Sequence, residues 1–264
     1  MHSVTLTQAL LLSLVAIIVG VDFWLEAFFL FRPIIVGTLT GLILGDVTTG
    51  LIAGGLTELA FAGLTPAGGT QPPNPILAGL MTTVIAYTTG TDPKTAIGLA
   101  LPFSFLMQYI ILFYYSTFSF FMSKADRYAE EADIKGLAKI NIITTSIVAL
   151  SYGIIVFLSV YVAQDLMKVI VQSMPAWLTH GFEVAGGILP AVGFGMLLRV
   201  MMKAEYTPYL IIGFFIASFI PFSNLLPVAV IGVALALYEY FHTKDQFAFD
   251  GGKVAKGDDF SEGI

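Results

Sequence analysis

The sequence contains no cysteine and few charged residues. Only 11% of its 264 residues are charged, whereas soluble domains usually carry about 25%, and 57% are hydrophobic. The mean hydropathy is +0.87. So few charges cannot cover a water-exposed surface, which excludes a soluble domain and indicates an integral membrane protein. Without cysteine, no disulfide framework, thiolate metal site or thiol nucleophile can form.

Other absences narrow the function further. The net charge of −6 argues against a nucleic-acid partner, because binding to phosphates needs clustered Lys and Arg. No Gly-x-x-x-x-Gly-Lys-Ser/Thr phosphate loop is present, so the chain does not hydrolyse ATP by itself. His2, His180 and His242 lie at segment ends without clustered acids. We therefore expect no metal, no cofactor and no phosphohistidine station in this chain.

Long apolar stretches predict an all-α, polytopic membrane protein. Residues 4–21 follow no basic region and precede no convincing cleavage site, so we expect mature protein there rather than a signal peptide. Residues 123–139 form a charge-dense loop, and 164–181 are expected to form a short interfacial helix. Five stretches are long enough, or nearly so, to span as helices: 96–122, 140–163, 182–198, 206–222 and 225–242.

The expected organisation is one membrane domain over 1–242, followed by a disordered tail over 243–264. Within the membrane domain, 1–90 is expected to form broken or re-entrant helices with a sugar-binding loop, and 95–242 to hold about five spanning helices and an interfacial segment. Nine of the twelve basic residues fall in the charged loop, in the tail, or at Arg199 and Lys203. With five spans all nine lie on one side, so the positive-inside tendency places the C-terminus in the cytoplasm.

The N-terminal third is interrupted by polar residues and prolines. Its apolar runs break at Asp22, at Arg32-Pro33, and across Leu-Thr-Pro-Ala-Gly-Gly-Thr-Gln-Pro-Pro-Asn-Pro at 64–75. Proline removes a backbone donor and forbids a continuous helix there. Short hydrophobic segments interrupted by Gly and Pro are typical of broken or re-entrant transporter helices. Such irregular backbone survives in a membrane only where protein or a wet cavity satisfies it.

Glycines recur every four residues on both sides of Asp46. Four-residue spacing gives a helix one smooth face, and small residues on such faces allow close helix packing. The members of the two series are Gly37, Gly41 and Gly45, then Gly50 and Gly54. Glu58 continues the second series and places a carboxylate on that face. A carboxylate at a helix centre costs about 2.5–3.5 kcal/mol on insertion scales, so Glu58 is expected to face a polar cavity or a partner.

Several other polar residues are candidates for binding a hydroxylated ligand such as a sugar. Thr70, Gln71 and Asn74 offer donors and acceptors between prolines, although a surface turn is the alternative interpretation. Gln108 lies within an apolar span, where an interhelical hydrogen bond is the alternative. Glu26 has Arg32 nearby as a possible ion-pair partner, and Asp46 could instead cap a helix.

The chain resembles the IIC membrane components of mannose-family phosphotransferase sugar permeases. The resemblance covers about residues 4–242 and rests first on Gly41-x-x-x-Gly45-Asp46-x-x-x-Gly50 with Gly54-Gly55-x-x-Glu58. The family match also includes Glu26 with Phe31-Arg32-Pro33, and Gly186-Gly187 with Gly193. The resemblance is closest to N-acetylgalactosamine and galactosamine members, through the segments Ala62 to Gly69, Gln71 to Pro75 and Met174 to Gly181. Mannose-type members end the 71–75 loop in Pro-Asp, where this chain has Pro73-Asn74.

The resemblance implies an assembly and a mechanism that composition does not show. It implies inverted structural repeats, a core that moves against a scaffold as in an elevator, and a bacterial inner-membrane location. The IIC chain would pair with a IID membrane subunit, with three such pairs assembled together. Soluble IIA and IIB proteins would relay phosphate from phosphoenolpyruvate, and IIB would phosphorylate the sugar on the cytoplasmic side.

The predicted sugar-binding residues are Glu58, Thr70, Gln71, Asn74, Glu26 and Gln108. A mannose- or sorbose-specific member of the same family is one alternative. An ion-coupled secondary transporter that uses Asp46 or Glu58 is another, and a membrane scaffold or receptor without transport activity is a third.

Overall fold

The computed structural model describes residues 2–64, 72–165, 169, 173–220 and 226–249. Within these ranges every regular element is a helix. The chain forms two compact units, residues 1–200 and 201–264. The prediction of an all-helical membrane protein is confirmed, while a single membrane domain over 1–242 stays a prediction.

Helix α1 (Leu6–Leu25) begins at a capping box. The Thr5 side chain accepts from the Gln8 amide, and the Gln8 side chain accepts from the Thr5 amide. The helix has 20 residues, or about 30 Å, which matches the hydrocarbon thickness of a bilayer. It ends at Glu26, whose backbone is left-handed with φ 48°.

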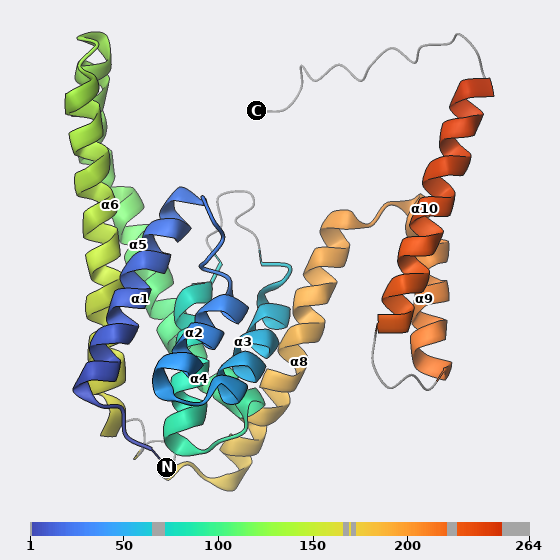
Figure 1. The fold of residues 1–264 in the computed structure, drawn as a ribbon, viewed down its shortest axis with the longest axis horizontal. Helices are drawn as coiled ribbons and strands as arrows, with labels where there is room; N and C mark the ends of the chain where they lie inside the picture. The colour runs from blue at the N-terminus through green and yellow to red at the C-terminus, as the bar shows by residue number, and fades with distance from the viewer. Residues whose placement is uncertain (1, 65–71, 166–168, 170–172, 221–225, 250–264) are drawn as a thin grey trace. The chain divides into compact units, whose positions relative to one another are not determined.

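Three short helices follow α1. Helices α2 (Pro33–Leu44), α3 (Val47–Phe61) and α4 (Pro75–Thr89) contain 12, 15 and 15 residues. At 1.5 Å per residue they reach only about 18–23 Å, too short to cross a bilayer of about 30 Å. They lie together beside α1 (Figure 1). The prediction of broken helices in the N-terminal third is therefore confirmed.

Helix α4 is the centre of this unit. Thirteen of its 15 residues are buried, and it packs against α2, α3 and α5 (Pro93–Glu130). Its four buried threonines donate their hydroxyls to backbone carbonyls four residues earlier, so these side chains are buried without losing hydrogen bonds. Helix α1 packs against α6 (Ile134–Phe157).

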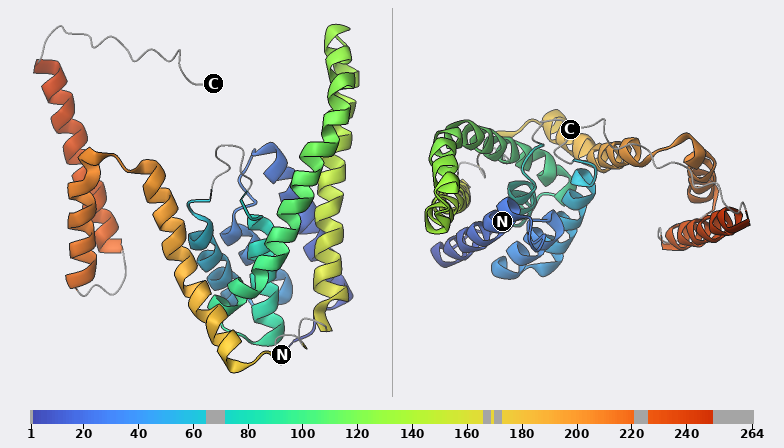
Figure 2. Two further views of the ribbon diagram at one scale, coloured as in Figure 1. Left: turned by 180° about the vertical axis from the view of Figure 1, so that it is seen from behind. Right: turned by 90° about the horizontal axis from the view of Figure 1, so that it is seen from above.

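Helices α5 (Pro93–Glu130) and α6 (Ile134–Phe157) form a long hairpin that extends past the short helices (Figure 2). The expectation of a loop over 123–139 is wrong, because only residues 131–133 separate the two helices. Ala, Lys, Arg and Glu favour helix even outside the membrane, Arg127 pairs with Glu131 at 3.6 Å, and Asp133 caps α6. The charges in this segment marked exposure to water rather than an end of the helix.

A π-helical turn, η1 (Leu158–Val162), continues α6. Helix α8 (Ala176–Met201) then includes the C-terminal part of the predicted interfacial segment. Four segments are long and apolar enough to cross a membrane: Leu6–Leu25, Pro93–Glu130, Ile134–Val162 and Ala176–Arg199.

The second unit contains the 3-10 turn η2 (Ala204–Tyr206) and helices α9 (Thr207–Phe219) and α10 (Leu226–Phe249). These helices cover most of the predicted spans 206–222 and 225–242. Helix α9 has 13 residues, about 20 Å, and is shorter than a full span. Helix α10 continues to Phe249, so residues 243–249 are helical where a disordered tail was expected, and 250–264 lie outside the described residues.

Glycines bring α2 and α3 into direct backbone contact. A Cβ built on Gly37 would lie 2.7 Å from Gly54 Cα, and one on Gly41 would lie 2.7 Å from Gly50 Cα. Neither distance leaves space for a methyl group. Gly45 has a different role from the predicted packing one, because a Cβ there would meet nothing within 4 Å. Its φ of 86° ends α2 in the left-handed conformation, which glycine adopts without strain.

We predict that Gly50→Ala destabilises the α2–α3 hairpin. The added Cβ would lie 2.5 Å from Gly37 O and 2.7 Å from Gly41 Cα, and backbone atoms can yield only if the helices separate. Overpacking of this kind costs about 1–3 kcal/mol. The measurement is thermal unfolding of the purified protein in detergent.

Gly55→Ala is the matched control for this prediction, because a Cβ on Gly55 of the same helix would meet nothing within 4 Å. It should be neutral or stabilising by up to about 1 kcal/mol, since alanine favours helix over glycine. Equal destabilisation by the two substitutions would show that the close contact does not limit packing here.

Candidate functional site

A cavity of about 580 Å³ lies among five helices. It is bounded by the ends of α1 and α3, the beginnings of α2 and α4, and Tyr115 of α5. Its volume suits a small organic ligand, for which pockets measure about 300–1,000 Å³. Its wall combines aromatic rings and prolines with one carboxylate and one guanidinium. The lining residues are Phe23, Trp24, Glu26, Phe29, Phe31, Arg32, Pro33, Phe61, Leu64, Pro72, Pro73, Pro75 and Tyr115.

The breaks in the apolar runs place these residues around the cavity. Helix α1 stops at Leu25, and the chain turns through residues 26–32 before Pro33 starts α2. Proline has no N–H to leave unsatisfied at a first helical position, so it starts a helix readily. Pro75 starts α4 in the same way. The cavity therefore occupies the space between the ends of the short helices.

The cationic group of the cavity, Arg32, is held by a carboxylate outside the wall. Its Nη2 pairs with Glu58 Oε1, and the Ile34 amide donates to Glu58 Oε2 at 3.3 Å. The Arg32 side chain is 45% exposed and that of Glu58 18%. Because a guanidinium has five N–H donors, Arg32 can bind Glu58 and still present donors to a ligand.

The predicted pairing of Arg32 with the nearby Glu26 is therefore replaced by a pairing with Glu58. Glu26 itself is exposed and lines the cavity. Glu58 is not among the lining residues. The two carboxylates thus have different positions: Glu26 at the wall and Glu58 behind Arg32.

Asn74 is fully buried and binds three helices together. Its Oδ1 accepts from the Leu77 amide at 3.1 Å and caps α4, and its Nδ2 donates to the Tyr152 hydroxyl at 2.5 Å. Its backbone carbonyl accepts from Ser104 Oγ at 2.7 Å. Asn74 is not among the cavity-lining residues, so its contact with a sugar stays a prediction.

Among the remaining polar candidates, none in the described part of the chain lines the cavity. Thr70 and Gln71 lie outside the described residues. Gln108 is half-buried on α5 and is not among the cavity-lining residues. Asp46 caps α3, accepting from the Thr49 amide at 3.0 Å and from the Thr49 hydroxyl at 2.6 Å. In the part of the chain that the structure describes, no three His, Asp or Glu side chains group as metal ligands.

The sequence interpretation missed the aromatic half of the cavity. Trp24 and Tyr115 face each other with ring centroids 5.8 Å apart, although they are far apart in the chain. Tyr115 could not be chosen among the many aromatics of its helix without the fold. Trp24 was easier to find, because it lies two residues from Glu26 and just after the break in the apolar run at Asp22. An aromatic residue so close to a candidate carboxylate indicates a shared site.

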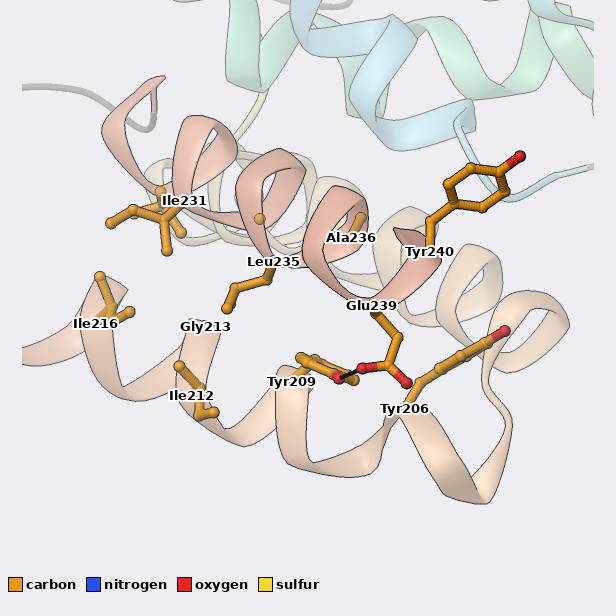
Figure 3. A pocket seen from close by; sticks show the side chains of 12 residues that line it. Tyr206, Tyr209, Ile212, Gly213, Ile216, Ile231, Leu235, Ala236, Glu239 and Tyr240 are labelled. Atoms are coloured by element: carbon orange, nitrogen blue, oxygen red, sulfur yellow. Dashed lines mark hydrogen bonds between the residues drawn. The ribbon is translucent and has the colours of Figure 1, made fainter. Parts of the chain in front are cut away.

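A second cavity, of about 830 Å³, lies between α9 and α10 (Figure 3). Its polar feature is the Tyr209 hydroxyl, which donates to Glu239 Oε2 at 2.7 Å. The labelled side chains around this pair are mostly aliphatic, among them Ile212, Ile216 and Leu235. The cavity at the end of α1 has the richer combination of charged and aromatic groups.

Known proteins resemble this chain over all or most of its length. N-acetylgalactosamine permease IIC component 1 of Escherichia coli (strain K12) is 63% identical over 267 positions, covering 100% of both chains. The fructose permease IIC component of Bacillus subtilis (strain 168) is 30% identical, covering 87% of this chain and 85% of the relative.

Two solved structures resemble this chain over most of its length. A chain described as a membrane protein matches with a TM-score of 0.79 and 29% identity, covering 90% of this chain and 96% of that one. A chain from the mannose transporter ManYZ in complex with microcin E492 matches with a TM-score of 0.58 and 28% identity, with the same coverage.

The family model for the sorbose-specific IIC component of the phosphotransferase system matches residues 6–238. Together with the relatives, this match confirms the resemblance that the glycine series and the residues around Glu58 indicated. The chain therefore belongs to the family of sorbose-type IIC components, the multi-pass membrane subunits of sugar phosphotransferase systems.

Proposed function

We propose that this chain binds N-acetylgalactosamine in the cavity at the end of α1 and carries it across the bacterial inner membrane. The observation that carries the proposal is the juxtaposition of Trp24 and Tyr115 with Glu26 and Arg32 around one cavity. The 63% identity to an N-acetylgalactosamine permease component supports the choice of sugar.

The cavity has the chemistry that a pyranose ring needs. One face of such a ring presents C–H groups, which pack well against the electron-rich face of an aromatic side chain. Its hydroxyls both donate and accept hydrogen bonds. Glu26 can accept them and Arg32 can donate to them, and such charge-assisted bonds are the stronger kind.

The remaining candidate residues have different proposed roles. Glu58 holds Arg32 against the wall and so acts through it. Pro72 and Pro73 line the cavity. Thr70 and Gln71 lie outside the described residues and are retained as proposed sugar contacts from the sequence. Asn74 fixes the start of α4, and Gln108 is retained as a candidate for a contact that forms during transport.

The assembly is proposed from the family. The chain would pair with a IID membrane subunit in a trimer of such pairs, with its C-terminus in the cytoplasm. A core domain would move as an elevator against a scaffold, and inverted repeats are expected within the fold. Soluble IIA and IIB would relay phosphate from phosphoenolpyruvate to the sugar, whose added charge prevents its return.

Vesicles test the transport mechanism. We expect vesicles with this chain and IID alone not to accumulate N-acetylgalactosamine, and vesicles supplied with phosphoenolpyruvate and the complete soluble phosphate relay, which ends in IIA and IIB, to form sugar phosphate. Accumulation driven by a proton or sodium gradient without these proteins would instead favour the ion-coupled alternative. Radiolabelled sugar and separation of the phosphorylated product give the measurement.

Trp24→Ala tests the aromatic contact. An aromatic contact is worth about 0.5–1.5 kcal/mol beyond the area it buries, so we expect about a tenfold loss of N-acetylgalactosamine affinity. Calorimetry on the purified complex with IID measures it, with galactosamine, mannose and sorbose as comparison sugars.

Trp177→Ala is the control for this prediction. It removes the other tryptophan, which is 73% exposed on α8 and is not among the cavity-lining residues. Affinity should not change. If Trp24→Ala binds the sugar as tightly as the control does, the sugar binds elsewhere.

A double-mutant cycle tests whether Glu58 acts through Arg32. We expect Glu58→Gln alone to weaken binding, because Arg32 loses the carboxylate that orients it. In an Arg32→Gln background the same substitution should have little further effect. Coupled groups deviate from additivity by about 0.5–3 kcal/mol. Additive losses of affinity would mean that Glu58 contacts the sugar itself.

A further inference from the structure

The buried carboxylate of Asp22 binds the backbone beside the cavity. It lies in the last turn of α1, and only 5% of its surface is exposed. Its Oδ1 accepts from the Phe28 amide at 2.7 Å, and its Oδ2 accepts from the Leu30 amide at 2.6 Å. Its backbone carbonyl also accepts from the Glu26 amide at 2.7 Å. Three amides of the turn over residues 26–32 thus bond to one residue.

This turn has an unusual backbone. Glu26 and Phe29 both adopt left-handed conformations, with φ of 48° and 59°. Residues other than glycine seldom adopt such values, and they persist only where the surroundings hold them. The Asp22 oxygens bind the amides on either side of Phe29, so they hold the turn at its strained point.

The same turn supplies part of the cavity wall. Glu26, Phe29, Phe31 and Arg32 all line the cavity, whereas Asp22 is not among the lining residues. At the far end of the turn, Glu58 pairs with Arg32 and accepts from the Ile34 amide. The turn is therefore fastened at both ends by carboxylates that lie outside the lining.

We infer that Asp22 is a positioning residue for the sugar site. By bonding the Phe28 and Leu30 amides it preorganises the turn that carries Glu26 and Arg32, which lowers the ordering cost of binding. This inference rests on the proposed sugar site and assigns to that site a residue that does not touch the sugar.

Asp22→Asn removes one of the two side-chain hydrogen bonds to the turn, with little change in the size of the side chain. An Asn side chain has one acceptor oxygen, and its NH₂ group would face a backbone N–H instead of accepting from it. One of the two anchors is lost and the turn loosens. We expect the KM for N-acetylgalactosamine to rise about tenfold with little change in kcat, because ordering the turn costs binding free energy while IIB performs the chemistry.

The experiment measures sugar phosphorylation by membranes that contain the full complex with IID, supplied with phosphoenolpyruvate and the complete soluble phosphate relay, which ends in IIA and IIB. Asp46→Asn is the matched control, since Asp46 also accepts two hydrogen bonds but caps α3 and is not among the cavity-lining residues. A merely structural loss lowers the amount of folded complex, and so the maximal rate, without changing KM. A higher KM in Asp22→Asn but not in Asp46→Asn supports the inference, and an unchanged KM in Asp22→Asn overturns it.

Two further variants separate the possible failures. Asp22→Glu keeps the charge but lengthens the side chain, so it should still raise KM in a folded complex, and it replaces Asp22→Asn if that variant does not fold. An unchanged KM in a folded Asp22→Glu complex would then overturn the inference. Trp24→Ala tests the cavity itself. If Trp24→Ala raises KM and the Asp22 variants do not, the positioning inference fails alone; if neither changes it, the proposed site fails as well.

Discussion

A helix that ends inside a membrane leaves amide and carbonyl groups that no water can satisfy, and three short helices follow one another here between residues 33 and 89. Side chains of the chain itself provide the missing partners. Asp22 binds the turn after α1, Asp46 caps α3 and Asn74 caps α4. Glu58 accepts from the Ile34 amide in the first turn of α2. Among the described residues, no buried side-chain nitrogen or oxygen lacks a hydrogen-bond partner.

This constraint separates two kinds of polar residue that look alike in a sequence. Most of the acids and amides of the N-terminal third are occupied in closing helix ends. Glu26 and Arg32 are different, because they also lie on the wall of a cavity. The glycine contacts between α2 and α3 make the arrangement possible, since close backbones let two short helices cover one side of α4. The site is thus a consequence of how the breaks between helices are closed.

The sequence predicts those properties that depend on composition and local pattern. Long apolar runs indicated the long helices, and prolines indicated the breaks. The four-residue glycine spacing picked out residues that meet in the α2–α3 contact, apart from Gly45. The sequence could not show which residues of different helices pair with one another. Arg32 pairs with Glu58 rather than with the nearby Glu26, and Asn74 bonds to Tyr152 on α6. The charged stretch 123–139 was predicted to be a loop, but most of it is helical. Charge indicates exposure to water, whereas helix propensity decides whether the chain continues as a helix.

Residue 74 differs from mannose-type members at a position between two prolines of the cavity wall. Mannose-type members, as the sequence resemblance implies, carry Asp where this chain has Asn74. Here Asn74 Nδ2 donates to the Tyr152 hydroxyl, and the residue has no exposed surface. A carboxylate cannot donate, so it would have to accept from Tyr152 and would place a negative charge between α4 and α6. Pro73 and Pro75, on either side, line the cavity. A change at residue 74 would therefore act on the cavity through the position of these prolines, as Asp22 is proposed to act on it through the turn that carries Glu26 and Arg32.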